Sequence, residues 1–354
     1  MKSANDPKDR EKQMLDDREQ LVLHTIINEY IQKSEPIGSR NVSKVGPLKM
    51  SPATIRNIMG DLEEKGYLVQ PHTSAGRIPT DLGYRYYIDH FVALERELDR
   101  IIKSELDEAF HFPVPNIPVM MREFSKRLGL LTSSVGFVVA SRTDSTALKQ
   151  IEFTRLNRNS VLAILISKAG IVQNILLSVE ATVTDNDLLH FSNYLNEELR
   201  AHGLAEVAES LSKELSEHKG EIYDIFSRIE ELREDSLGFF VEGAANILNF
   251  PEFQDTARLK NLLRTLDEKQ LLCDILDKCL DTEGVQIFVG SEIGIGDADE
   301  LGIVTRSYSK GGRVVGMLGV IGPKRMQYSK MISVVDYSAD IITGMLNQLY
   351  GGYE

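Results

Sequence analysis

Tryptophan is absent from this 354-residue chain, and only two cysteines occur, Cys273 and Cys279. They are six residues apart in a segment with helical character, a spacing that favours neither a disulfide nor a pair of metal ligands. We expect buried free thiols, in keeping with a reducing cytoplasm. The longest apolar run, residues 161–166, is far too short to span a bilayer, and residues 1–20 are charged throughout, unlike a signal peptide. A secreted or membrane-spanning protein is therefore not expected.

The motifs of nucleotide-binding and hydrolytic enzymes are also missing. The sequence contains neither a GxGxxG nor a Walker motif, and its seven histidines form no HxxxH or HExxH pair. The glycine-rich stretch GSEIGIG, at 290–296, is followed by acidic residues that would repel a phosphate, so we interpret it as a plain loop. Serine and histidine occur in no recognisable nucleophile motif. Catalysis is thus the weakest hypothesis, and we expect neither a cofactor nor a metal site.

Charge is unevenly distributed along the chain. The net charge of −13 argues against non-specific coating of nucleic acid. Between residues 33 and 57, however, five basic residues accompany a single acid, Glu35. A basic local surface on an acidic protein is typical of specific DNA binding.

Residues 50–80 predict a recognition helix followed by a two-stranded wing. Ser51 is a good N-cap, Pro52 occupies the first helical position, and Gly66 ends the helix. Its buried face is predicted to consist of Ile55, Ile58, Met59 and Leu62. The opposite face is small and polar in its N-terminal half and acidic in its C-terminal half, which suits a helix that points its first turns at DNA. Strand formers at 67–69, a Thr-Ser-Ala-Gly tip and a returning Arg77-Ile78 complete the wing.

Further helices are expected on both sides of this stretch. A helix over about 18–33 precedes a short one over 38–45, for which Ser39 is a plausible cap. With the helix and hairpin that follow, this is the element order of a winged helix. The aromatic residues of 84–87 recur at helical spacing and favour packing over nucleic-acid contact, although Arg85 is placed to reach a phosphate.

Eight side chains of this region are candidates for contact with DNA. Arg56 and Asn57 can make paired hydrogen bonds to base edges, whereas the wing residues are placed to touch phosphate or enter a minor groove. The full set is Arg40, Ser51, Thr54, Arg56, Asn57, His72, Ser74 and Arg77. The alternative remains that the helix and hairpin belong to a core or to a protein–protein module, where helix-turn-helix geometry also occurs.

Four sequence runs are specific enough to compare with known families: IGSR (37–40), SPATIRN (51–57), DLEEKGYL (61–68) and QPHTSAGRIPTDLGYRYYID (70–89). They resemble the HrcA family of heat-inducible transcription repressors. The resemblance is sharpest over about residues 18–91 and continues, more weakly, to the C-terminus. The sequence departs from the family pattern at Ile58 and Gly60, where an acidic residue and alanine are more usual, and residues 1–17 look like an extra segment.

The resemblance implies a cytoplasmic, non-enzymatic repressor of chaperone operons that binds an inverted-repeat DNA operator as a homodimer. It also implies that the chaperonin assists the folding or activity of the repressor. The alternative is a small-ligand-responsive regulator that senses through a GAF-like pocket, but residues 313–321 are apolar on both faces of a predicted strand, which favours a filled core.

The remaining sequence predicts a mixture of strands and helices. Strands are expected at 135–140, 148–156, 161–166, 171–179, 286–289, 302–308 and 313–321. The stretch 185–280 has a helical pattern throughout, and a last helix is expected at about 326–350. The apolar positions of 185–280 exceed what one helix layer needs, so we expect the dimer contact there.

These elements, with the resemblance, indicate an α+β fold in four parts. We expect a flexible N-terminal segment at 1–17 and a winged helix-turn-helix DNA-binding domain at 18–91. A GAF-like α/β sandwich domain is expected to combine 92–147 with 284–354. It would be interrupted by an inserted α+β dimerising domain at 148–283.

Overall fold

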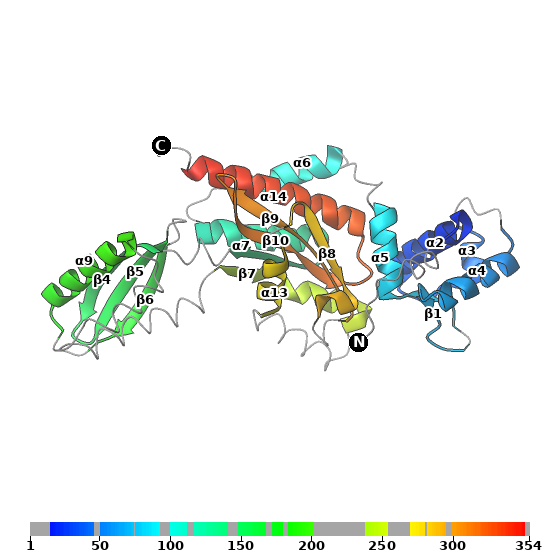
Figure 1. Cartoon of the computed structure of the whole chain (residues 1–354), viewed down its shortest axis with the longest axis horizontal. Helices are drawn as coiled ribbons and strands as arrows, with labels where there is room; N and C mark the ends of the chain where they lie inside the picture. Colours follow the sequence, from blue (N-terminus) through cyan, green and yellow to red (C-terminus); the bar gives the residue numbers. More distant parts are fainter. Residues whose placement is uncertain are drawn as a thin grey trace.

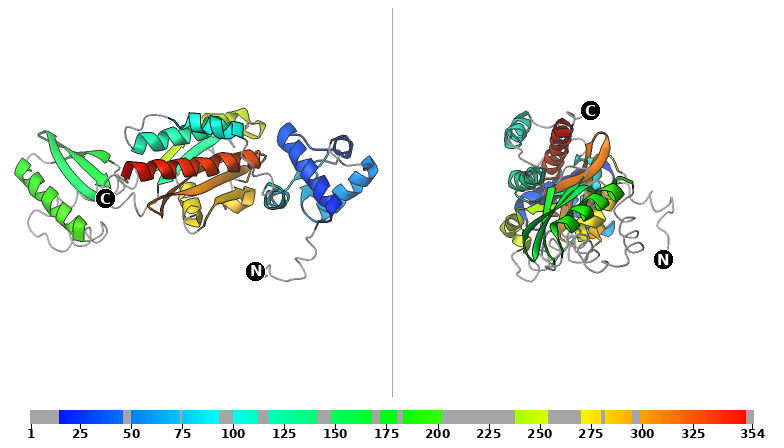
Figure 2. Two further views of the ribbon diagram at one scale, coloured as in Figure 1. Left: turned by 90° about the horizontal axis from the view of Figure 1, so that it is seen from above. Right: turned by 90° about the vertical axis from the view of Figure 1, so that its left-hand side faces the viewer.

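The computed structural model describes residues 15–45, 50–73, 75–92, 100–111, 117–140, 148–167, 172–179, 183–201, 238–253, 270–279, 282–294 and 299–350. These residues form three bodies that lie in a row (Figures 1 and 2). We name them the N-terminal unit, which includes residues 15–92, the central body, which is built on a five-stranded sheet, and the distal unit, which includes residues 148–201.

The N-terminal unit has the element order expected from the sequence. Its elements are α2 (Asp17–Lys33), α3 (Ser39–Val42), α4 (Pro52–Glu64), β1 (Leu68–Val69), β2 (Ile78–Pro79) and α5 (Asp81–His90). A capping box starts α2: the Asp16 carboxylate accepts from the Glu19 amide at 2.8 Å, and the Glu19 carboxylate accepts from the Asp16 amide at 2.9 Å. The expected cap of α3 is wrong, because Gly38 has the extended backbone of a cap and Ser39 is buried in the first turn.

Helix α4 confirms its predicted caps and its buried face. The Ser51 hydroxyl accepts from the Thr54 amide at 3.2 Å, and Pro52 begins the helix. Its buried side chains are Ile55, Ile58, Met59 and Leu62. Gly66 follows the helix with φ +82°, a left-handed conformation that favours glycine.

The hairpin after α4 is stabilised by a third backbone segment. Strands β1 and β2 pair Leu68 with Pro79 and Val69 with Ile78. Ile37, between α2 and α3, forms a further antiparallel bridge with Arg77 through two 2.9 Å hydrogen bonds. Because an isolated two-stranded hairpin is only marginally stable in water, this bridge anchors the hairpin to the helices.

The central body is an antiparallel sheet with the strand order β7-β3-β10-β9-β8. The strands are β3 (Val135–Ala140), β7 (Phe239–Glu242), β8 (Val285–Val289), β9 (Leu301–Lys310) and β10 (Arg313–Pro323). Its helices are α6 (Arg100–Ala109), α7 (Ile117–Thr132), α13 (Gln270–Cys279) and α14 (Tyr328–Tyr350), with the 3-10 helices η2 (Ala244–Asn249), η3 (Pro251–Phe253) and η4 (Gly290–Ile293). In the described part of the chain, no helix has the length and apolar character needed to cross a membrane.

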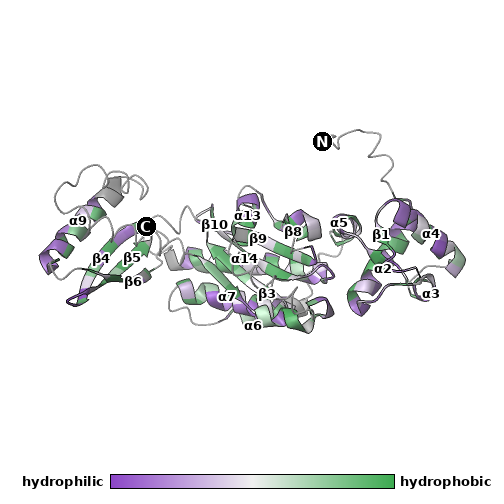
Figure 3. Cartoon of the chain, turned by 90° about the horizontal axis from the view of Figure 1, so that it is seen from below, coloured by the Kyte–Doolittle hydropathy of each residue, from purple (hydrophilic) through white to green (hydrophobic). Residues whose placement is uncertain are grey.

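Alternate residues of the central strands pack on opposite sides of the sheet. Phe137 and Met317 share a core with Ile275 of α13, whereas Val138 and Leu318 belong to the core that includes α7 and α14. Figure 3 shows the strands of the larger sheets as mainly hydrophobic. The expectation of a filled sheet core is therefore confirmed for these strands.

Strand β7 corrects the prediction of helix throughout 185–280. It pairs with β3, with Phe239 opposite Val139 and Glu242 opposite Gly136. The Phe-Phe-Val run is strand-forming, and the glycines that bound it, Gly238 and Gly243, both have left-handed backbones. The Ala140 amide donates to the Gly238 carbonyl at 2.8 Å, so the chain leaves and re-enters the central sheet at one place. We accordingly propose that the described residues 238–253 and 270–279 belong to the central body and not to the inserted domain.

The distal unit is a three-stranded antiparallel meander covered on one side by a helix. Its strands are β4 (Leu148–Asn157), β5 (Ser160–Ser167) and β6 (Val172–Ser178), and its helix is α9 (Asp185–Ala201). Thr184 caps α9, as its hydroxyl accepts from the Asp187 amide at 3.2 Å. The Asn196 side chain accepts from the Ile151 amide at 2.8 Å and donates to its carbonyl at 2.9 Å, which ties the helix to the edge strand β4.

Both cysteines lie on α13, and neither forms a disulfide. Cys279 is buried, as expected, whereas Cys273 is only half-buried. Burial raises the pKa of the Cys279 thiol to about 11, against a smaller opposing effect of Lys278.

Cys279 is expected to resist a small thiol reagent in the native protein at pH 8. With its pKa at about 11, only about one thiol in a thousand is ionised at that pH, and the side chain is 1% exposed. Mass spectrometry after alkylation should find Cys279 unmodified until guanidinium unfolds the chain, with Cys273 as the internal reference. Rapid native alkylation of Cys279 would contradict its burial.

Candidate nucleic-acid interface

The first turns of α4 present an exposed polar surface opposite the buried side of the helix. Ser51, Arg56 and Asn57 are exposed, and Thr54 is half-buried. The Ser51 and Thr54 hydroxyls lie 2.9 Å apart, so part of their hydrogen-bonding capacity is used by the cap itself. Within the described residues, the Arg56 and Asn57 side chains have no hydrogen-bond or ion-pair partner. They are free to bind a ligand.

Charge changes sign along this helix. Asp61 and Glu64 are exposed on its C-terminal half, whereas Arg56 is the exposed charge of its N-terminal half. Arg40 is exposed on α3, which packs against α4. An anion such as a phosphate is therefore attracted to the start of α4 and repelled from its end.

The tip of the hairpin is held by a side chain that the sequence analysis missed. The Gln70 amide donates to the Thr73 carbonyl at 2.9 Å and to the Ala75 carbonyl at 3.0 Å. His72 is exposed on this tip, and Ser74 lies outside the described residues. A glutamine at the end of a strand formed no recognisable motif, because its role depends on the fold of the turn.

Arg77 does not have the position expected of a free phosphate ligand. Its Nε and Nη2 atoms lie 2.9 and 2.8 Å from Oε2 of Glu63, and its side chain is one-fifth exposed. The guanidinium thus ties the hairpin to α4. The expectation overlooked an acidic partner on the preceding helix.

Arg77→Ala is expected to lower the free energy of unfolding by about 0.5–1 kcal/mol, because a half-buried ion pair between two elements is lost. Glu63→Gln should have a similar effect, and chemical denaturation measures both. Unchanged stability together with an equal loss of affinity for operator and random DNA would restore the phosphate role.

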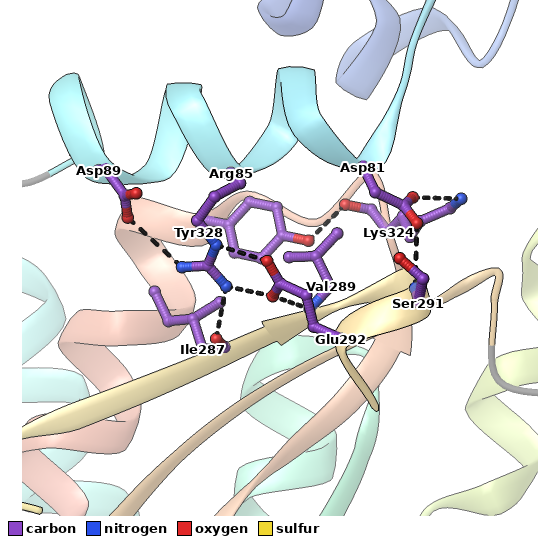
Figure 4. Close-up of polar contacts among 9 residues, drawn as sticks. All are labelled: Asp81, Arg85, Asp89, Ile287, Val289, Ser291, Glu292, Lys324 and Tyr328. Atoms are coloured by element: carbon purple, nitrogen blue, oxygen red, sulfur yellow. Dashed lines mark hydrogen bonds and ion pairs between the residues drawn. The ribbon is translucent and has the colours of Figure 1, made fainter. Parts of the chain in front are cut away.

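Arg85 also differs from its expected role. Its Nε donates to Glu292 Oε1 at 2.8 Å, and its Nη2 donates to the Ile287 carbonyl at 2.7 Å and contacts Glu292 Oε2 (Figure 4). Arg85 therefore contacts the central body and does not project as a free phosphate ligand. Residues 290–293 of the glycine-rich stretch, expected to be a loop, form the short helix η4 that supplies Glu292.

Comparisons with known proteins show which proteins this chain is similar to. Residues 119–332 match the family model of the HrcA protein C terminal domain. The heat-inducible transcription repressor HrcA of Geobacter sulfurreducens is 40% identical over 338 residues, which cover 94% of this chain and 98% of the relative. The HrcA repressor of Syntrophobacter fumaroxidans is 36% identical over 345 residues, with coverages of 94% and 98%.

A crystal structure of a hypothetical protein at 2.2 Å resolution has the same fold as this chain. It aligns with a TM-score of 0.63 at 24% sequence identity and covers 95% of this chain and 99% of its own. The family-model match over residues 119–332 and the near-full-length match to curated repressors assign the chain to its family. The chain belongs to the HrcA family of heat-inducible transcription repressors.

Proposed function

We propose that the chain is a homodimeric repressor that binds an inverted-repeat operator of chaperone operons through a winged helix. The exposed Arg56 and Asn57 on the first turns of α4 carry the proposal. Guanidinium and carboxamide groups make paired hydrogen bonds to base edges in the major groove, which is wide enough to admit an α-helix. The small Ala53 beside them lets the helix backbone approach the bases.

The polarity of the surface supports one docking orientation. Exposed acids on the C-terminal half of α4 are repelled by the phosphates, so that half tilts away from the groove. Arg40 and His72 are exposed on either side of the helix in sequence and are proposed phosphate contacts, together with Ser74. Arg77 leaves this set because Glu63 occupies its guanidinium.

A dimer is part of the proposal because one winged helix buries only about 600–1,000 Å² on DNA and seldom gives operator-grade specificity alone. The side of the distal sheet opposite α9 carries a row of half-buried and exposed apolar residues: Leu162, Ile164, Ile166, Val172 and Leu176. We call this row the outer sheet face. A two-fold axis through it would bury the same patch of both chains.

The outer sheet face is a better candidate than the helical stretch first expected to form the contact. Leu195 of α9 is completely buried against the distal sheet, and Phe239 and Phe240 belong to β7. These residues are therefore used inside the chain. The outer sheet face retains apolar area that the described residues do not cover.

The central body is proposed to correspond to the GAF-like domain. A small-ligand sensor would need an open pocket there, whereas Phe137, Val138, Met317 and Leu318 fill both sides of the sheet. The packed core therefore favours a structural role over ligand sensing. The dependence on the chaperonin rests on the family resemblance alone.

Footprinting on the chaperone promoters of the host tests the proposal. Purified protein should protect an inverted repeat at concentrations well below those at which it binds random duplex, with similar contacts on both half-sites. Equal affinity for promoter and random DNA over a salt titration would contradict the proposed function.

A further inference from the structure

Helix α5 is joined to the central body by two charged side chains one helical turn apart. The Asp81 carboxylate accepts from the Lys324 ammonium at 2.9 Å and from the Ser291 amide at 3.0 Å. Arg85 binds Glu292 and the Ile287 carbonyl as described above. We call these contacts the α5 joint (Figure 4).

The partners of the α5 joint are themselves held by the central body. Glu292 also accepts from the Val289 amide at 3.0 Å, and the Tyr328 hydroxyl donates to the Lys324 carbonyl at 2.6 Å. These hydrogen bonds fix the side chains of Glu292 and Tyr328, which contact Arg85 and Tyr84 of α5. The joint is therefore built on η4 and on the segment that runs from the end of β10 to the start of α14.

Close approach of the backbone supports a specific fit at this place. Gly290 has φ +53°, and a Cβ atom there would lie 2.5 Å from the Asp81 carboxylate. Beneath the charged contacts, Tyr84 of α5 packs near Tyr328 with their ring centroids 6.4 Å apart, and both side chains are buried. The two bodies thus share a buried aromatic contact in addition to the charged contacts.

A second contact connects the central body to another element of the N-terminal unit. Arg325 donates to the Ile31 carbonyl in the last turn of α2 at 3.3 Å and is paired with Glu252 of η3. Contacts to both α2 and α5 restrict rotation of the N-terminal unit relative to the central body more than a single contact would. A rotation of about 10° displaces a point ~20 Å away by ~3.5 Å, which is about one base-pair step along DNA.

We propose that Asp81 and Arg85 are positioning residues that set the separation of the two recognition helices in the dimer, an inference that rests on the proposed function. They touch no DNA and act by fixing the angle between the N-terminal unit and the central body. A dimer with a firm joint accepts one half-site spacing, whereas a dimer with a loose joint tolerates several.

The Asp81→Asn/Glu292→Gln double variant tests this proposal, because it removes two charges of the joint while nearly preserving side-chain shape. Binding is measured on the operator, on operators with one base pair added to or removed from the spacer, on a single half-site and on random duplex. We expect an affinity about tenfold lower at the native spacing and a spacing penalty reduced to about threefold or less. Half-site and random-DNA affinities should remain within about twofold of those of the unmodified protein.

Arg306→Gln is the matched control. Arg306 lies 2.9 Å from both Asp336 and Asp340, is about as exposed as Arg85, and makes these contacts inside the central body. Its variant should keep the wild-type spacing profile. The proposal would be overturned if the double variant kept the wild-type dependence of affinity on spacer length. It would also be overturned if Arg306→Gln weakened that dependence as much as the double variant does.

A measurement without DNA separates this proposal from the proposed function. Spin labels at Glu64→Cys and Lys330→Cys, in a Cys273→Ser background, report the distance between the two bodies. We expect a narrow distance distribution that broadens in the double variant. Broadening in a protein that shows no operator preference would refute the proposed function but not the joint, whereas an unchanged distribution would refute the joint.

Discussion

Alanine at Arg56 or Asn57 is expected to weaken operator binding by about 1–3 kcal/mol while leaving the melting temperature unchanged. Both side chains are exposed on the first turns of α4, opposite its buried face, so their loss removes contacts with DNA and not with the core. Titration with the operator measures the affinity of each variant, and thermal melting measures its stability. Random-DNA affinity should fall for Arg56→Ala, which removes a positive charge, and stay constant for Asn57→Ala.

Glu64→Ala is the control on the same helix. Glu64 is exposed on the acidic half of α4, so its removal should leave operator specificity intact and slightly raise affinity for any duplex. If Arg56→Ala and Asn57→Ala both retain full operator affinity with native melting, α4 is not the recognition helix.

Leu176→Asp is expected to convert the proposed dimer to a monomer and to lower operator affinity by about a hundredfold or more, because one winged helix then binds one half-site. Leu176 is 64% exposed at the centre of β6 and belongs to the outer sheet face. A charge there would be buried and unpaired in a two-fold interface, at a cost of several kcal/mol. Light scattering measures the mass of the particle in solution, and titrations of the operator and of a half-site measure the loss of affinity.

Leu189→Asp supplies the comparison in the same unit. Leu189 is 59% exposed on α9, which covers the opposite side of the distal sheet, so its variant should remain a dimer. A dimeric Leu176→Asp protein with undiminished operator affinity would place the contact elsewhere. The half-site affinity of Leu176→Asp should match that of the unmodified protein.

The sequence predicted the elements whose signals are local. The cap at Ser51 and the apolar period of α4 depend on neighbours within a few residues, and the structure confirms them. Family resemblance supplied the broad function, since no single residue pattern distinguishes a repressor from another helix-turn-helix protein.

The contacts that the sequence did not predict join segments that are distant in the chain. Arg77 pairs with Glu63 on the preceding helix, and Arg85 pairs with Glu292 more than two hundred residues away. Composition cannot distinguish such paired arginines from free ones. Strand β7 was missed because its four residues lie in a long helical pattern, although the glycines on both sides were a usable signal.

The pH response of the α5 joint follows from Asp81. Burial raises the pKa of this carboxyl, but the Ser291 amide and the Lys324 ammonium outweigh burial and hold the pKa below its usual value of 3.8. The stabilisation from a lowered carboxyl pKa is complete above 3.8 and is lost as the pH falls through the folded-state pKa. The Asp81 contacts therefore persist throughout the neutral range.

The hydrogen bond between Ala140 and Gly238 gives the chain the topology of an insertion at the tip of a hairpin. Strands β3 and β7 are antiparallel neighbours, so a tight turn could join them directly and leave every strand pair of the central sheet in place. The distal unit can then be lost, gained or exchanged without changing the fold of the central body. Under the proposed function, evolution could therefore change how two subunits meet while conserving how each subunit holds the N-terminal unit.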